Sequence, residues 1–202
     1  ETTTGYNSSS ATKKMHEGSR DTINLIGQYN FDLDSKIVYG LENESDAAEI
    51  PSNYTTGSTY HSMKYASAEE KINSQYLDYQ FRPSKNFYST IGFRRDKHSI
   101  AGSYNTGRAT IAYKLDNNSK LRSSFGTGLR FPSLNEYYFG SSVQNRSSLV
   151  PEESTSFDFG IDKIIPDHNL NFSTTFFNIN YENYIGGWAS HTDDDNTYVQ
   201  KN

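Results

Sequence analysis

The sequence predicts an all-β fold: an antiparallel up-and-down transmembrane β-barrel to which this chain contributes about ten strands. Three observations support this prediction. Short segments alternate between apolar and polar residues, and short connections alternate with long ones. The chain is also polar on average, with a mean hydropathy of -0.82, yet 14% of its residues are aromatic. In a membrane barrel only every second strand residue faces lipid, so this mixture is typical of the fold.

The overall composition argues against other classes of protein. The 16 Tyr, 12 Phe and 1 Trp are too many for a disordered chain, because disordered segments are poor in aromatic residues. No apolar run reaches the roughly 18 residues of a transmembrane helix. A net charge of -5 argues against a nucleic-acid partner, which would require a basic surface. The absence of cysteine fits maturation in an oxidising compartment without disulfides.

Ten segments are predicted as strands because alternation gives each of them one apolar and one polar face. In the second segment, for example, Ile23, Leu25 and Tyr29 share a face opposite Asn24 and Gln28. No amphipathic helix competes with these assignments. The predicted strands are Thr4–Met15, Asp21–Phe31, Lys36–Glu44, Lys71–Arg82, Asn86–Arg95, Gly107–Leu115, Lys120–Gly128, Ser154–Asp162, Asn169–Glu182 and Thr197–Asn202.

The connections between these strands predict how the two ends of the sheet differ. Outer-membrane barrels have short periplasmic turns and long extracellular loops, whereas nothing gathers the long loops of a soluble β-sandwich at one end. The one exception to the alternation is a short connection at His16–Arg20. The short, turn-like connections are Asp32–Ser35, Arg82–Asn86, Asp116–Ser119 and Ile164–His168, and the long ones are Ser45–Glu70, Asp96–Thr106, Leu129–Glu153 and Asn183–Asn196.

The most informative segment runs from Phe125 to Gly160 and reads FGTGLRFPSLNEYYFGSSVQNRSSLVPEESTSFDFG. It closely resembles the signature of TonB-dependent outer-membrane receptors, roughly G-T-G-[FY]-[RK]-x-P-[ST]-L-x-E-[LY]-[YF] followed by N-P-x-L-x-P-E-x-[ST]-x-x-x-E-x-G. Arg146 stands where proline is usual, and Asp158 stands where glutamate is common. The matching residues are Gly126, Thr127, Gly128, Arg130, Pro132, Ser133, Leu134, Glu136, Tyr137, Asn145, Leu149, Pro151, Glu152, Ser154 and Gly160.

The resemblance continues on both sides of this signature and covers about Lys71–Ile185. The run Gly92–Ser99 is similar to the family's G-x-R-x-D-x-H strand end, and the hairpin Tyr113–Gly126 and the strand Phe176–Ile185 also have counterparts. The family builds barrels of about 22 strands around an N-terminal plug domain. The resemblance therefore implies that residues 1–202 are an interior part of such a barrel domain, with the plug, the TonB-contacting segment and the other strands outside the chain.

What the resemblance implies about function is active uptake of a scarce nutrient, such as a ferric siderophore or cobalamin, across the outer membrane of a Gram-negative bacterium. Its implied partners are the nutrient or metal chelate, the plug domain, TonB and outer-membrane lipids. Two alternatives remain: a passive porin-like channel, and a soluble or surface-displayed β-sandwich that binds a ligand. No nucleophile elbow, zinc-spaced histidines or phosphate-binding loop is present, so we expect neither an enzyme nor a cofactor.

Several residues are candidates for ligand binding at the loops or in the lumen: Arg95, His98, Arg130, Tyr137 and Tyr138. Cationic side chains in the lumen would attract an anionic chelate, while the tyrosines could instead belong to the aromatic girdle. Asp193, Asp194 and Asp195 offer oxygen ligands for Ca²⁺, or form an acidic solvated loop. The signature residues expected to have structural roles are Gly126, Gly128, Pro132, Leu134, Glu136, Leu149, Pro151 and Glu152.

Overall fold

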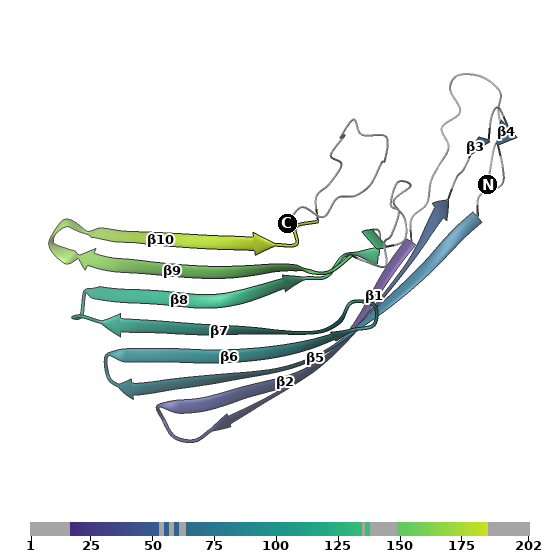
Figure 1. The fold of residues 1–202 in the computed structure, drawn as a ribbon. Helices are drawn as coiled ribbons and strands as arrows, with labels where there is room; N and C mark the ends of the chain where they lie inside the picture. The colour runs from purple at the N-terminus through teal and green to yellow at the C-terminus, as the bar shows by residue number, and fades with distance from the viewer. Residues whose placement is uncertain are drawn as a thin grey trace.

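Long, regular strands fill most of the part of the chain that the computed structural model describes, residues 17–52, 55–56, 59–60, 64–134, 136–137 and 149–185. Eight strands form one antiparallel sheet in the order β1-β2-β5-β6-β7-β8-β9-β10 (Figure 1). A separate two-stranded sheet pairs β3 (Thr55–Thr56) with β4 (Thr59–Tyr60). The eight strands are β1 (Glu17–Asn30), β2 (Ser35–Ser52), β5 (Lys64–Ser84), β6 (Phe87–His98), β7 (Gly102–Lys114), β8 (Ser119–Arg130), β9 (Glu152–Ile165) and β10 (Leu170–Glu182).

This strand order is the predicted up-and-down topology, in which each strand pairs with its neighbours along the sequence. All eight predicted strands from Asp21–Phe31 to Asn169–Glu182 are confirmed, and most are longer than alternation alone indicates. The predicted strands Thr4–Met15 and Thr197–Asn202 lie outside the described residues. Within the described ranges, no helix is long and apolar enough to cross a membrane.

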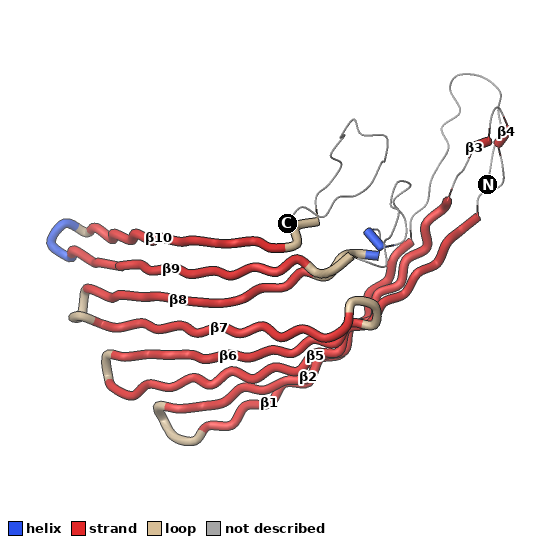
Figure 2. Tube along the Cα trace, viewed as in Figure 1, coloured by secondary structure: helices blue, strands red, loops and turns tan. Residues whose placement is uncertain are grey.

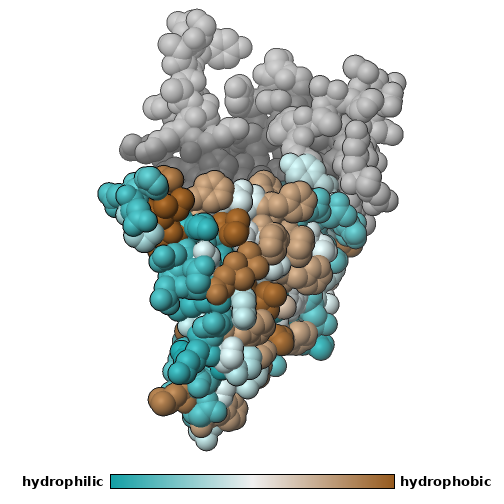
Figure 3. Space-filling view, turned by 90° about the vertical axis from the view of Figure 1, so that its left-hand side faces the viewer, coloured by the Kyte–Doolittle hydropathy of each residue, from teal (hydrophilic) through white to brown (hydrophobic). Residues whose placement is uncertain are grey.

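The two faces of the sheet differ sharply in polarity. Directly paired residues lie on the same face, so the register assigns each side chain to one face or the other. Viewed along the strands from the turns, hydrophobic residues gather in a band beside a hydrophilic strip (Figure 3). We call these the apolar face and the polar face. One apolar row crosses six strands as Ile37, Tyr79, Ile91, Ala109, Phe125 and Phe157, and the next row, on the polar face, is Val38, Asp78, Gly92, Arg108, Gly126 and Ser156.

Tight turns close the strands at one end of the sheet, which we call the turn end (Figure 2). Asp32 and Asp116 stabilise two of these turns by accepting the backbone N–H groups of Asp34 at 2.8 Å and Asn118 at 2.7 Å. These hydrogen bonds lower the pKa of both carboxyls. A 3₁₀ turn, Pro166–His168, closes the last hairpin and is followed by Asn169 at a φ of 49°. The four predicted short turns are therefore confirmed.

The opposite end, the loop end, corrects three predicted connections. Asp96–Thr106 is not a long loop, because β6 continues to His98 and β7 begins at Gly102. Strands β2 and β5 also extend to Ser52 and from Lys64 into the predicted loop Ser45–Glu70. The predicted break at His16–Arg20 is wrong from residue 17 onward, since those residues belong to β1. Apolar and polar residues do not alternate regularly along these extensions, so the pattern predicts no strand there although the backbone ladder continues.

The exposed apolar face argues against the β-sandwich alternative. A sandwich would cover that face with a second large sheet, and within the described residues the only other sheet is the β3–β4 pair. Large side chains on this face are instead exposed, including Ile23 at 74% and Phe93 at 54%. Because water-soluble proteins rarely expose extended apolar patches, this face requires an apolar environment. The buried hydrophobic residues, Leu134, Tyr137 and Ile185, lie beyond the strand ends.

Candidate functional site: the loop-end clamp and the polar face

Arg130, the last residue of β8, binds two carboxylates at the loop end. Its Nε and Nη2 lie 2.7 and 2.9 Å from the carboxylate oxygens of Glu152, the first residue of β9. Its Nη1 and Nη2 lie 3.1 and 3.2 Å from those of Glu136, which follows β8. Two-pronged guanidinium–carboxylate pairing is a strong and directional interaction. We call Arg130, Glu136 and Glu152 the loop-end clamp.

The sequence places Glu136 in the clamp through a local turn that begins at Ser133. The Glu136 carboxylate accepts the backbone N–H and the hydroxyl of Ser133 at 2.7 and 3.0 Å, and the Ser133 hydroxyl accepts the N–H of Glu136 at 3.3 Å. This Ser-x-x-Glu spacing is that of a capping box. Burial alone would raise the pKa of Glu136, but the hydrogen bonds from Arg130 and Ser133 outweigh it and lower that pKa.

Glu152 extends the clamp to a third segment. Its carboxylate accepts the backbone N–H of Ile185, just after β10, at 2.7 Å. Pro132 and Pro151, which flank the long connection, are both fully buried. A proline is tolerated at such strand ends because no ladder donor is required there. The clamp therefore ties the ends of β8, β9 and β10 together. Two of the signature residues with a predicted structural role, Glu136 and Glu152, belong to it.

His98 lies beside the clamp and is fully buried, with a side-chain exposure of 0%. Its Nδ1 accepts the backbone N–H groups of Ile100 and Ala101, both at 3.1 Å, and so closes the turn between β6 and β7. Its Nε2 lies 3.3 Å from Glu70, and its ring stacks on Phe131 with centroids 4.4 Å apart. His98 is the last residue of β6 rather than a loop residue, and its imidazole is enclosed by protein. Its contact with a ligand stays a prediction.

The polar face carries an ion-pair network in its middle and upper rows. Arg94 binds Glu42 at 2.7 Å and Asp96 at 2.8 Å, and it also donates to the hydroxyl of Ser74 at 2.7 Å. One row lower, Arg108 pairs with Asp78 at 2.8 Å. Each charged group of this network contacts a group of opposite sign, and its three carboxylates outnumber its two guanidinium groups, so the surface is hydrophilic and slightly anionic.

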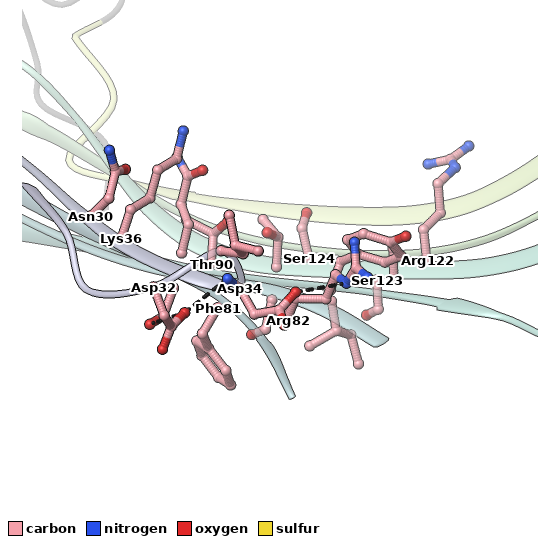
Figure 4. Close-up of a pocket in the computed structure, with 18 of the residues that line it drawn as sticks. Asn30, Asp32, Asp34, Lys36, Phe81, Arg82, Thr90, Arg122, Ser123 and Ser124 are labelled. Carbon is pink, nitrogen blue, oxygen red and sulfur yellow. Dashed lines mark hydrogen bonds and ion pairs between the residues drawn. The ribbon is translucent and has the colours of Figure 1, made fainter. Parts of the chain in front are cut away.

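A shallow groove follows the polar face toward the turn end (Figure 4). The sheet curves around the side on which Asn30, Lys36 and Arg122 project, while Phe81 points to the other side. Arg122 lies 3.3 Å from Asp162, which Lys120 also approaches to 3.1 Å. The concave side of the sheet is therefore lined with hydroxyl, amide and charged groups, and its surface is hydrophilic rather than an apolar pocket.

Of the remaining predicted site residues, Arg95 and Tyr137 lie within the described residues and the others lie outside them. Arg95 lies on the apolar face, because it is two and four residues beyond Phe93 and Ile91 on the same strand. The neighbouring Arg94 is the arginine of this motif that lies on the polar face. Tyr137 is buried at 4% exposure and packs near His98. Tyr138 and the candidate calcium ligands Asp193, Asp194 and Asp195 lie outside the described residues. In the ranges that the structure describes, no group of three acidic or histidine side chains could hold a metal.

The sequence offered Arg94 and Arg95 alike as cations of the lumen, and it did not predict that Arg94 pairs with Glu42 and Asp96. Counting alternate positions back from Phe93 along β6 separates Arg94 from Arg95 without a structure. The partner of Arg94 on β2 was not predictable in this way, because the register between β2 and β6 passes through β5.

Residues of the Phe125–Gly160 signature form the clamp at the loop end of one curved antiparallel sheet whose concave side is polar. The family model for the TonB-dependent receptor-like β-barrel matches residues 1–200. The chain belongs to the TonB-dependent receptor β-barrel family. This family comprises receptors and transporters, and the predicted fold class and family are both confirmed.

Solved structures support the same fold for this TonB-dependent receptor barrel. The siderophore receptor PirA from Acinetobacter baumannii aligns with a TM-score of 0.68 and 18% identity over 85% of this chain and 28% of its own. The ferric enterobactin receptor PfeA from Pseudomonas aeruginosa aligns with a TM-score of 0.74 and 17% identity over 92% and 31%. The copper transporter OprC aligns at 0.68 and 14% over 84% and 31%. The chain thus spans about a third of the length of these proteins.

Proposed function

We propose that this chain forms part of the wall and extracellular loops of an outer-membrane receptor that imports a scarce metal chelate, most specifically a ferric siderophore, with energy from TonB. The observation that carries the proposal is the two-faced sheet of a TonB-dependent receptor barrel. The exposed apolar face meets lipid, and the polar face meets the lumen and the plug. The loop end is then extracellular and the turn end periplasmic, as in other outer-membrane barrels.

The lengths of the strands support this placement. A strand that crosses the membrane needs about 9–11 residues, and β6 to β10 have 12 to 14. Strands β2 and β5 have 18 and 21 residues, so they extend beyond the membrane at the loop end. We infer that this extension forms part of the extracellular funnel where ligand first binds.

The cargo class rests on two observations. The structural relatives include receptors for siderophores and a copper transporter, which favours a metal or metal chelate over cobalamin. The polar face is hydrophilic, and Arg94 and Arg108 are paired with carboxylates. A hydrophilic chelate could pass such a surface without being held by an unpaired cation. A passive porin-like channel is the rival, because the same wall could surround an open pore.

The test is uptake of radiolabelled iron by cells that produce the full-length receptor and lack their own siderophore receptors. We expect uptake with a ferric siderophore that disappears when TonB is deleted or the proton-motive force is collapsed. Uptake that persists without TonB would support the porin. Uptake of cobalamin or copper but not of iron would keep the receptor and change its cargo.

A further inference from the structure

Two buried titratable side chains face each other at the loop end, outside the clamp. The side chain of His98 has an exposure of 0% and that of Glu70 has an exposure of 8%. Nε2 of His98 lies 3.3 Å from Oε2 of Glu70, and neither atom has a hydrogen-bonding partner among the described residues. Buried polar atoms without a partner are uncommon and costly in folded proteins, which indicates that this pair has a role beyond packing.

The other nitrogen of the imidazole fixes the protonation state that the closed turn requires. Nδ1 accepts the backbone N–H groups of Ile100 and Ala101, both at 3.1 Å. An imidazole nitrogen accepts hydrogen bonds only while it carries no proton. The closed turn between β6 and β7 therefore requires a neutral His98 whose proton is on Nε2, the atom that faces Glu70.

Glu70 favours the opposite protonation state. Its carboxylate, 3.3 Å from Nε2, attracts a positively charged imidazolium. An imidazolium, however, would direct an N–H at Nδ1 toward two backbone N–H groups, so both hydrogen bonds of the turn would break. A closed turn with a neutral imidazole thus competes with an open turn that contains a His98–Glu70 ion pair. Acid favours the open turn, because only this arrangement takes up the additional proton.

The other charged groups that the structure describes around this pair have partners of their own. Asp96, on the same face of β6, is bound by Arg94 at 2.8 Å. On β2, Asp46 and Glu44 are bound by Arg20 at 2.5 and 3.5 Å. The tyrosines around the pair are Tyr104 on β7 and Tyr137 after β8. Tyrosine hydroxyls stay uncharged below about pH 9, which leaves the pair itself to respond to acid.

We propose that the turn from His98 to Gly102 is a proton-sensitive switch that opens in mild acid and loosens the segment that follows β8. The imidazole connects the two parts, because it closes the turn through Nδ1 and stacks on Phe131 with ring centroids 4.4 Å apart. This switch goes beyond the proposed function, and only its placement on the extracellular side of the membrane rests on that function.

The experiment measures hydrogen exchange at single amides of the purified full-length receptor, by mass spectrometry with electron-transfer fragmentation. Protection, corrected for the intrinsic effect of pH, is compared at about pH 7.5 and about pH 5.5, on either side of the range in which histidine ordinarily titrates. We expect the protection of Ile100 and Ala101 to fall at least about fivefold at the lower pH. The N–H of Ser99 donates instead to the backbone oxygen of Lys71 at 2.9 Å, so its protection should not change.

Two variants identify the groups that respond. His98→Asn keeps an acceptor near the same place but does not titrate, so its protection should be the same at both pH values. Glu70→Gln removes the carboxylate that favours the imidazolium, so the turn should open only at a lower pH than in the wild type. The matched control is His168→Asn, which replaces an exposed histidine at the turn end and should behave like the wild type.

Three results would overturn the inference: equal protection of the wild type at both pH values, the same fall in His98→Asn, or an unchanged opening pH in Glu70→Gln. If His98→Asn fails to fold, the comparison of the wild type with Glu70→Gln decides, because that variant keeps His98 and its turn. Exchange does not depend on transport, so the two proposals fail separately. Protection that ignores pH contradicts only the switch, whereas iron uptake that persists without TonB contradicts only the receptor function.

Discussion

Arg130 links the segment that follows β8, through Glu136, to the start of β9, through Glu152. Its replacement tests the loop-end clamp. In Arg130→Ala, the carboxylates of Glu136 and Glu152 face each other without a cation. We expect a loss of about 1–2 kcal/mol in the free energy of unfolding, a modest value because Arg130 is 46% exposed. Urea unfolding of the full-length receptor in detergent measures it. Arg130→Lys, which cannot pair with two prongs, should recover only part of the loss, and full recovery would contradict the proposed geometry.

His98 presents a second test at the level of single residues. The turn depends on the acceptor at Nδ1, which binds the N–H groups of Ile100 and Ala101. His98→Phe keeps the stacking on Phe131 but removes the acceptor, so amide exchange at both positions should become about 3- to 10-fold faster. His98→Asn keeps an acceptor near the same place and should exchange more slowly than the Phe variant. Hydrogen exchange followed by mass spectrometry compares them, and identical rates would remove His98 from the turn.

Glu136 makes the clamp sensitive to acid. Its pKa is lowered in the folded protein because the hydrogen bonds from Arg130 and Ser133 outweigh the effect of burial. The stabilisation is therefore complete above the ordinary glutamate pKa of about 4.3, and it is lost as the pH falls through the lowered, folded-state value. We expect the difference in unfolding free energy between the wild type and Glu136→Gln to be constant from pH 7 to about pH 5 and to shrink below that. A difference that grows on acidification would refute this assignment.

At the scale of strands, glycines leave room for long polar side chains in the neighbouring strand. A Cβ at Gly160 on β9 would lie 2.8 Å from Cζ of Arg122 and 3.0 Å from the backbone oxygen of Thr174. Gly160→Ala should therefore displace the Arg122 guanidinium and press on β10, at a cost of about 1–3 kcal/mol.

The matched control for this prediction is Gly107→Ala on β7. The nearest atom to a Cβ at that position is the backbone oxygen of Gly92 at 3.5 Å, which is an ordinary contact. We expect this change to be neutral or slightly stabilising, because alanine restricts the unfolded chain. Unfolding midpoints of the two variants give the comparison, and equal effects would show that the space beside Arg122 is not limiting.

At the scale of the whole molecule, the two-faced sheet predicts which residues water reaches in the membrane. Residues 1–202 contain no cysteine, so each introduced cysteine is the single thiol of this segment. Ile91→Cys on the apolar face should resist a water-soluble maleimide in native outer membranes, whereas Thr90→Cys on the polar face should react. The pair Phe157→Cys and Asp158→Cys repeats the test on β9. Equal labelling within both pairs would contradict the barrel wall.

Eight of the predicted strands and the family could be predicted from the sequence, because both depend on patterns within short segments. Alternation over a few residues separates the two faces, and turn residues such as Asp32 and Asp116 end the strands. The signature between Phe125 and Gly160 identified the receptor barrel that the family match then confirmed. The pattern did not predict the extensions of β2 and β5, where apolar and polar residues do not alternate regularly.

Which charged residues form pairs became clear only from the folded sheet. Arg94 and Arg95 are adjacent in the sequence, yet one joins Glu42 and Asp96 on the polar face while the other stands on the apolar face. The sequence predicted His98 as a loop residue, whereas Glu70 and Phe131 contact its buried ring in the folded protein. Arg130 was predicted as a ligand contact, and the strand register places Glu152 directly beside it. These contacts join residues distant in sequence, so they depend on inter-strand register, which the pattern of a single strand does not contain.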